Sequence, residues 1–247
     1  MIRDMSSPFA SAQAIAVPTA TDRPSRERWA ELMLVLFVAF AAPITTSLYH
    51  SFFGYPGSTV SGNLRYLYMG IQETGAVLVL WYVLRRTDRS FSSIGFRVSL
   101  KGALSGVVLA VLGWLGYLLV IAAIQVTHRH YFGSYVATVD YHALLPKTTL
   151  AVLVPFVVLN SFYEEAIVRA YLMTEMSQLA GSMVLAAAAS VVVQASYHTY
   201  QGWLAVSGAS ATFTVFSFYY ARRRKLFPIY IAHVIYDLLA VTTLMAR

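Results

Sequence analysis

Seven long apolar runs constrain this chain more than any other feature of its sequence. They cover residues at about 29–49, 66–84, 103–126, 148–172, 182–202, 203–221 and 226–245. A helix needs about 20 predominantly apolar residues to cross the hydrocarbon core of a bilayer, and each run is long enough. The sequence therefore predicts an all-α fold, a polytopic transmembrane helical bundle with about seven spans.

The composition agrees with a membrane protein and narrows its chemistry. Of the 247 residues, 58% are hydrophobic and 12% are charged, whereas about 25% are charged in an ordinary soluble domain. The chain has no cysteine, which excludes disulfides, thiolate nucleophiles and cysteine-ligated metal centres. Residues 1–28 have neither periodicity nor the apolar run of a cleavable signal. We predict a disordered tail there, followed by one transmembrane domain at 29–247.

The positions of the basic residues predict how the helices are oriented. Those at the ends expected on one side of the membrane are Arg3, Arg23, Arg26, Arg28, Arg85, Arg86, Arg89, Arg97, Lys101, Arg222, Arg223, Arg224 and Lys225. Those at the opposite ends are Arg65, Arg129, Lys147 and Arg247. Because cytoplasmic loops carry the excess of Lys and Arg, we predict a cytoplasmic N-terminus. The basic residues do not form the aromatic-interleaved stripe of a nucleic-acid-binding protein.

A few ionisable side chains lie inside the predicted spans. An ionised side chain at mid-bilayer costs at least about 2.5–3.5 kcal/mol on insertion scales, so each one is a functional candidate. They are Glu73, Glu164, Glu165, Arg169, His198, His233 and Asp237. Nothing near Glu73 in the sequence pairs with it, and we interpret Glu73 as a structural residue that hydrogen-bonds between helices.

The fourth run carries two adjacent carboxylates with different expected roles. Helical spacing puts Glu165 and Arg169 one turn apart, so these two side chains can neutralise each other. Glu164 points about 100° away, beneath Asn160, and has no cation near it in the sequence. Glu164 is therefore the candidate general base.

Two later runs each carry a pair of polar residues at helical spacing. Gln194 and His198 are four residues apart, as are His233 and Asp237, so each pair predicts one polar stripe along a helix. We expect both stripes to meet Glu164 around one pocket. The span midpoints, however, place Glu164 and His198 about 10–12 Å apart in depth, a gap that helix tilt or shifted boundaries must close.

Two histidines with carboxylates support two hydrolytic schemes. In the first, Glu164 and His198 deprotonate a water molecule while His233 and Asp237 stabilise the oxyanion. An ionised Asp237 cannot donate a hydrogen bond, so it would be protonated or would orient His233. In the second, Glu164, His198 and His233 bind zinc, which activates the water. The sequence leaves both schemes open.

Other membrane chemistries lack a residue that they require. The HExxH signature is absent, and no lysine lies in a span for a retinal Schiff base. A rhomboid-like serine site would rest on Ser207 and Gly208 with His233, without the glycine that precedes the serine. The histidines at 128, 130 and 142 lack chelate spacing, and we interpret their segment as a solvated loop.

Three motifs in a fixed order resemble those of the CPBP family, the type II CAAX prenyl proteases and their bacteriocin-processing relatives. The motifs are Glu164-Glu165-x-x-x-Arg169, then His198, then His233-x-x-x-Asp237, and the resemblance covers about residues 145–245. It implies an intramembrane endopeptidase that hydrolyses a peptide bond of a membrane-presented protein. It also implies that Glu164 and His198 activate the water, and that His233 and Asp237 form the oxyanion pocket.

Two positions depart from the pattern of the family. Gln194 stands where a Phe usually precedes the histidine of the second motif, which changes the pocket wall. Asp237 stands where Asn is frequent, which removes an amide donor from the oxyanion pocket. Members of that family are described both as glutamate-dependent proteases and as metalloproteases. The resemblance therefore implies zinc as a possible cofactor.

Two other classes of function stay open at this point. One is a non-catalytic membrane scaffold or bacteriocin-immunity protein of the same fold, in which the polar residues hold helices together. The other is a proton-coupled transporter that uses Glu73 and Glu164, although no inverted repeat is visible. In each case we expect a multi-pass protein of a bacterial cytoplasmic membrane, with lipids as partners. The sequence does not predict the oligomeric state.

Overall fold

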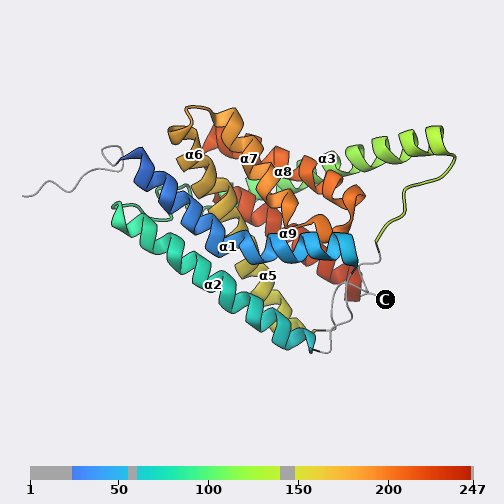
Figure 1. The fold of residues 1–247 in the computed structure, drawn as a ribbon, viewed down its shortest axis with the longest axis horizontal. Coiled ribbons are helices and arrows are strands. Elements are labelled where there is room, and N and C mark those ends of the chain that lie inside the picture. The colour runs from blue at the N-terminus through green and yellow to red at the C-terminus, as the bar shows by residue number, and fades with distance from the viewer. Residues whose placement is uncertain (1–23, 55–59, 140–147, 246–247) are drawn as a thin grey trace, which may run out of the picture.

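The computed structural model describes residues 24–54, 60–139 and 148–245, and all regular structure in these ranges is helical (Figure 1). The first three helices are α1 (Ser25–Phe53), α2 (Gly62–Arg86) and α3 (Leu100–Phe132). A continuous helical rod follows, made of α5 (Leu150–Glu164), the π-helix η1 (Glu165–Leu172) and α6 (Met173–Leu179). The last elements are α7 (Met183–Ser196), the short 3₁₀ helix η2 (Thr199–Gln201), α8 (Trp203–Arg223) and α9 (Phe227–Met245).

The helical bundle is confirmed for the described residues, and it belongs to an integral membrane protein. Four helical segments are long and apolar enough to cross a membrane: α1, α2, α3 and the rod over Leu150–Leu179. The segments Met183–Ser196 and Phe227–Thr242 are apolar but shorter. The count of seven spans stays a prediction. Helix α1 begins at Ser25, and residues 1–23 of the predicted tail lie outside the described residues.

Small residues let α3 approach α8 and α9 closely. A Cβ atom added at Gly106 would lie 2.7 Å from the carbonyl oxygen of Pro228 on α9. One added at Gly113 would lie 2.7 Å from the hydroxyl of Tyr236 and 3.0 Å from Thr212 on α8. A side chain at either glycine would push the helices apart, so the glycines of α3 serve packing within the chain.

The rod runs through the bundle and carries the first predicted motif. Helix α5 packs against α2 and α9, α6 packs against α7, and α3 packs against α8 and α9 (Figure 1). Every residue of η1 is buried. The motif residues on the rod are therefore enclosed by elements from both halves of the chain.

The basic segments that the topology prediction groups together meet at one end of the bundle. Arg28 at the start of α1 and Arg89 after α2 both bind Glu175 of α6. The backbone N–H of Leu226, before α9, donates to the carbonyl oxygen of Gly95 in the α2–α3 loop at 3.0 Å. The side of the membrane that this end faces stays a prediction. The basic residues that lie outside the described ranges are Arg3, Arg23, Lys147 and Arg247.

Candidate active site

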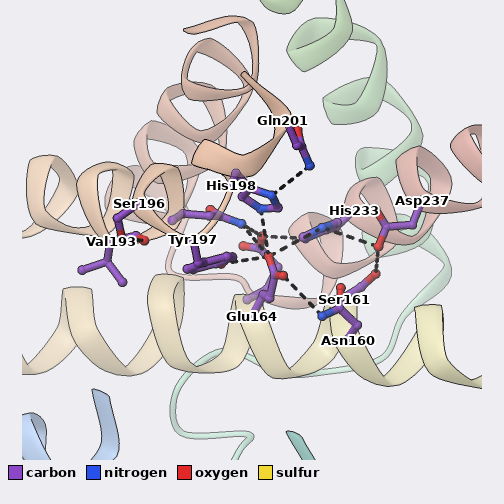
Figure 2. Close-up of polar contacts among 12 residues, drawn as sticks. Asn160, Ser161, Glu164, Val193, Ser196, Tyr197, His198, Gln201, His233 and Asp237 are labelled. Carbon is purple, nitrogen blue, oxygen red and sulfur yellow. Dashed lines mark hydrogen bonds and ion pairs between the residues drawn. The ribbon is translucent and has the colours of Figure 1, made fainter. Parts of the chain in front are cut away.

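Three segments of the chain converge on the carboxylate of Glu164 (Figure 2). Glu164 is the last residue of α5 and is buried, with 5% of its surface exposed. Its Oε2 atom lies 3.8 Å from Nε2 of His198 and 3.9 Å from Nε2 of His233 on α9. The structure therefore brings together the three residues predicted to share one pocket.

His198 lies in a turn between α7 and η2 that the sequence did not predict. Helix α7 ends at Ser196, and His198 lies in the turn before η2 with φ −102° and ψ 0°. The prediction of one polar stripe along a helix through Gln194 and His198 is wrong, because the apolar run contains a turn that ends at Gly202. Gly202 has φ +84°, a conformation that side chains other than glycine rarely adopt. This turn also removes the depth gap expected between Glu164 and His198.

The orientation of the His198 ring is set by its other nitrogen. The Nδ1 atom lies 3.1 Å from the amide Nε2 of Gln201, and the ring stacks on Phe213 with a centroid distance of 5.4 Å. The buried Nε2 atom has no hydrogen-bond partner among the described residues. It is thus the nitrogen that faces Glu164.

The second carboxylate of the motif binds the second histidine. Oε1 of Glu165 lies 2.8 Å from Nδ1 of His233, and Oε2 lies 3.6 Å from Nε of Arg169. The predicted pairing of Glu165 with Arg169 is confirmed. The bond to His233 joins η1 to α9 and was not predicted, because the two residues are far apart in the sequence.

The π-helix η1 begins immediately after Glu164 and changes how the two carboxylates are presented. Adjacent residues of an α-helix point about 100° apart, yet Oε2 of Glu164 and Oε1 of Glu165 both lie within 3.4 Å of the Nε2 atom of Gln194. π-Helical turns are rare and are frequently found at functional sites. No proline or glycine in η1 signals this turn in the sequence.

Gln194, the departure from the family pattern, is a buried polar link between the rod and α7. Its Oε1 accepts a hydrogen bond from Nη2 of Arg169. Its Nε2 donates to Oε2 of Glu164 at 3.0 Å and lies 3.4 Å from Oε1 of Glu165. The guanidinium thus holds the amide in the orientation that turns its N–H groups toward both carboxylates.

Two further donors complete the surroundings of Glu164. The hydroxyl of Tyr197 donates to Oε2 at 2.9 Å. The amide of Asn160 lies 3.3 Å from Oε1, as the helical spacing predicts, and the same nitrogen donates at 3.0 Å to Oε1 of Glu73 on α2. Glu73 is buried and does hydrogen-bond between helices, but its partner is a residue of the site. The sequence identifies Glu73 only as an ionisable residue inside a predicted span, and it carries no signal for its contact with Asn160 or for the role of Tyr197.

Asp237 lies one helical turn after His233 on α9. Its Oδ2 atom is 3.6 Å from Nε2 of His233, which confirms the predicted pairing. The same oxygen is 3.1 Å from Oγ of Ser161, a hydroxyl that also lies 2.9 Å from the carbonyl oxygen of Val157. Asp237 is thus tied to α5 as well as to its own helix.

Residues 146–239 match the model of the Rce1-like family, described as type II CAAX prenyl endopeptidases. The matched segment contains all three motifs and every site residue predicted from the sequence. The match assigns this segment of the chain to the CPBP family of CAAX proteases. No curated protein and no solved structure matches the chain.

The match supports a membrane-embedded protease of the CAAX type in general. Helices α1, α2 and α3 lie outside the matched segment. Glu73 nevertheless reaches the site from α2 through Asn160. The neighbourhood of the CPBP motifs is therefore completed by a helix that the family match does not cover.

The donor types in the pocket suit zinc, since imidazole nitrogen and carboxylate oxygen are both zinc ligands. Among the described residues, however, no group of three or more His, Asp or Glu side chains is arranged to hold a metal ion. The set of Glu164, His198 and His233 as zinc ligands stays a prediction, which metal analysis of the purified protein would test.

Two other sites that the sequence offered have structural roles. Oγ of Ser207 donates to the carbonyl oxygen of Trp203 on its own helix at 2.7 Å, and Gly208 packs against the ring of Tyr117. Near the end of α3, Nδ1 of His128 lies 2.7 Å from the carbonyl oxygen of Ser134. His128 and His130 are both in α3, so the prediction of a loop is wrong for these two residues. His142 lies outside the described residues.

Proposed function

We propose that the chain is an intramembrane endopeptidase that hydrolyses a peptide bond of a membrane-presented protein or peptide with a water activated by Glu164 and His198. The observation that carries this proposal is the position of Oε2 of Glu164, which faces the Nε2 atoms of two histidines from separate elements. The match to a family of endopeptidases supports the reaction class.

The proposed first step is deprotonation of the water. Oε2 of Glu164 and Nε2 of His198 are 3.8 Å apart, so one water molecule can contact both atoms. Glu164 accepts a proton as the water oxygen forms a bond to the carbonyl carbon of the substrate. The proton then passes to the amide nitrogen as the C–N bond breaks and the amine leaves.

His233 is the proposed donor to the oxyanion. Its Nδ1 bonds to Glu165 at 2.8 Å, and its Nε2 faces the pocket. When the ring is doubly protonated, Nε2 donates a hydrogen bond to the oxygen on which negative charge develops. Asp237, held by Ser161, lies 3.6 Å from this nitrogen and would keep the ring in place.

Two supporting pairs would hold the general base. Arg169 fixes the amide of Gln194, which donates to Glu164 from one side. Glu73 fixes the amide of Asn160, which donates from the other side. Because the carboxylate accepts from both amides and from a tyrosine, its rotation is restricted before substrate binds.

The test compares protein N-termini by mass spectrometry in cells that express equal amounts of the wild type, Glu164→Gln or Ser207→Ala. We expect new N-termini with the wild type and the serine variant, and none with Glu164→Gln. Termini that persist in Glu164→Gln would refute the proposed base. If no terminus depends on the protein and Glu164→Gln keeps all biological function, the protein is a scaffold of the same fold.

A further inference from the structure

A groove of about 510 Å³ opens at the basic end of the bundle, away from the candidate active site. The α2–α3 loop, the start of α3 and the segment that joins α8 to α9 form its walls. Five cationic side chains line it: Arg97, Lys101, Arg223, Arg224 and Lys225. All five residues are exposed.

No acidic residue is found among the described residues that line this groove. Glu175, a buried acidic residue at the same end of the bundle, is bound by Arg28 and Arg89 instead. Like charges placed close together repel each other, and a bound anion would remove this repulsion. The groove thus has the charge and the size of a site for an anionic group.

The two basic segments are held together by the fold. The N–H of Leu226 donates to the carbonyl oxygen of Gly95 at 3.0 Å. Gly95 has φ +96°, and a Cβ atom there would collide with the carbonyl oxygen of Arg224. Because these backbone contacts join the loops, the cations cannot separate simply by moving the loops apart.

Apolar side chains continue from the groove along the outside of the bundle. Val98 is 75% exposed, Leu100 is 78% exposed and Leu104 is 60% exposed. These residues lie on both sides of Lys101 in the sequence, where α3 enters the predicted membrane region. A cationic pocket beside an exposed apolar surface is complementary to a molecule with an anionic head and an apolar tail.

We propose that this groove binds the phosphate of an anionic phospholipid, whose acyl chains lie along the first turns of α3. Basic pockets between transmembrane helices are a known type of site for anionic lipid headgroups. The positive-inside distribution alone requires only that the cations lie on one side of the membrane. The proposal adds that cations from two separate segments act on one lipid molecule.

The test measures binding of phosphatidylglycerol to the purified full-length protein in detergent by native mass spectrometry, with phosphatidylcholine as the neutral lipid. The groove variant is Arg97→Gln/Lys101→Gln/Arg223→Gln. The control is Arg26→Gln/Arg85→Gln/Arg86→Gln, which removes the same charge near the same end of the bundle from residues that do not line the groove. We expect the groove variant to lose on the order of tenfold in affinity for phosphatidylglycerol, and the control to change little.

Several outcomes would overturn the proposal. Equal losses in the two triple variants would mean a general attraction between a basic face and anionic lipid. Equal binding of phosphatidylcholine by the wild type would remove the role of the anionic headgroup. If inorganic phosphate at millimolar concentration binds with the same dependence on Lys101 and displaces the lipid, the site is one for free phosphate.

Folding and proteolysis are both separable from this measurement. The single variants Lys101→Gln and Arg223→Gln change exposed residues, and each is expected to weaken phosphatidylglycerol binding a few-fold. They keep the proposal falsifiable if the triple variant does not fold. Since binding is read without cleavage, Glu164→Gln should bind the lipid as the wild type does, whatever becomes of the proposed function.

Discussion

Two buried carboxylates on the same helical rod have opposite surroundings. Glu175 on α6 receives guanidinium groups from Arg28 and Arg89, which only donate hydrogen bonds. Glu164 at the end of α5 receives three neutral donors and faces two imidazoles, the side chain that most often gives or takes a proton in general acid–base catalysis. Burial alone therefore does not mark a reactive carboxylate. What distinguishes Glu164 is that its partners can exchange protons.

The largest expected difference between Glu164 and Glu175 is in the rate of cleavage when each is replaced. Glu164→Gln should lower the rate of substrate cleavage by about 10²–10⁴-fold, because it removes the proposed proton acceptor. Glu175→Gln should leave the rate per folded molecule nearly unchanged, since Glu175 is far along the rod from the histidines. Both rates would be measured on a substrate identified from the comparison of N-termini. A large loss in Glu175→Gln at full folding would break the distinction.

The next effect separates the same pair by stability. Glu175→Gln leaves Arg28 and Arg89 with a neutral partner, and we expect a loss near the lower end of about 3–5 kcal/mol, because both arginines are partly exposed. Glu164→Gln keeps only one acceptor oxygen, but it leaves no guanidinium without its carboxylate, and it should cost less. Unfolding of the purified protein in detergent, followed by circular dichroism, gives both values. The reverse order of stabilities would contradict the structural role of Glu175.

A smaller effect tests how the neutral donors act on Glu164. Gln194→Glu keeps the acceptor for Arg169 but removes the N–H groups that face Glu164, and should lower kcat by about 10–100-fold with little change in KM. Gln194→Leu removes the acceptor as well as the N–H groups. It should also lower stability, because Arg169 is left with an unpaired buried donor. Wild-type kcat in Gln194→Glu would show that the amide does not position the base.

The smallest effect tests the link through Asn160. Glu73→Ala should lower kcat up to about tenfold, the value of one hydrogen bond, while Glu73→Gln, which keeps an acceptor, should restore most of it. In a double-mutant cycle, Asn160→Ala should mask the effect of Glu73→Ala, because the proposed action of Glu73 passes through the amide. Fully additive losses would mean that Glu73 acts independently of Asn160.

The sequence predicts the helical fold and the central residues because these depend on local patterns. The apolar runs predict the helices of the described residues, and spacing by four predicts the contacts Glu165–Arg169 and His233–Asp237. Each of these rests on neighbours within one helical turn. The order of the three motifs then indicates the family.

The remaining features of the site depend on contacts that no local pattern contains. Glu73 lies 87 positions from Asn160 along the chain, so only the packing of α2 on α5 brings them together. The turn at His198 is hidden within an apolar run, and η1 lacks the proline or glycine that usually signals a break. Apolar periodicity identifies which segments are buried. It does not identify the residue at which a buried helix changes from α-helical to π-helical geometry.

Because it contains a π-helix, the rod can accommodate a deletion of one residue better than a regular α-helix can. A π-helical turn contains more residues than an α-helical turn, so η1 holds surplus chain length between Glu164 and Glu175. Deleting one residue within η1 would allow a return to α-helical geometry while α5 and α6 keep their packing. The length of this segment, more than the identity of its apolar residues, would then determine whether Glu165 and Arg169 reach His233 and Gln194 together.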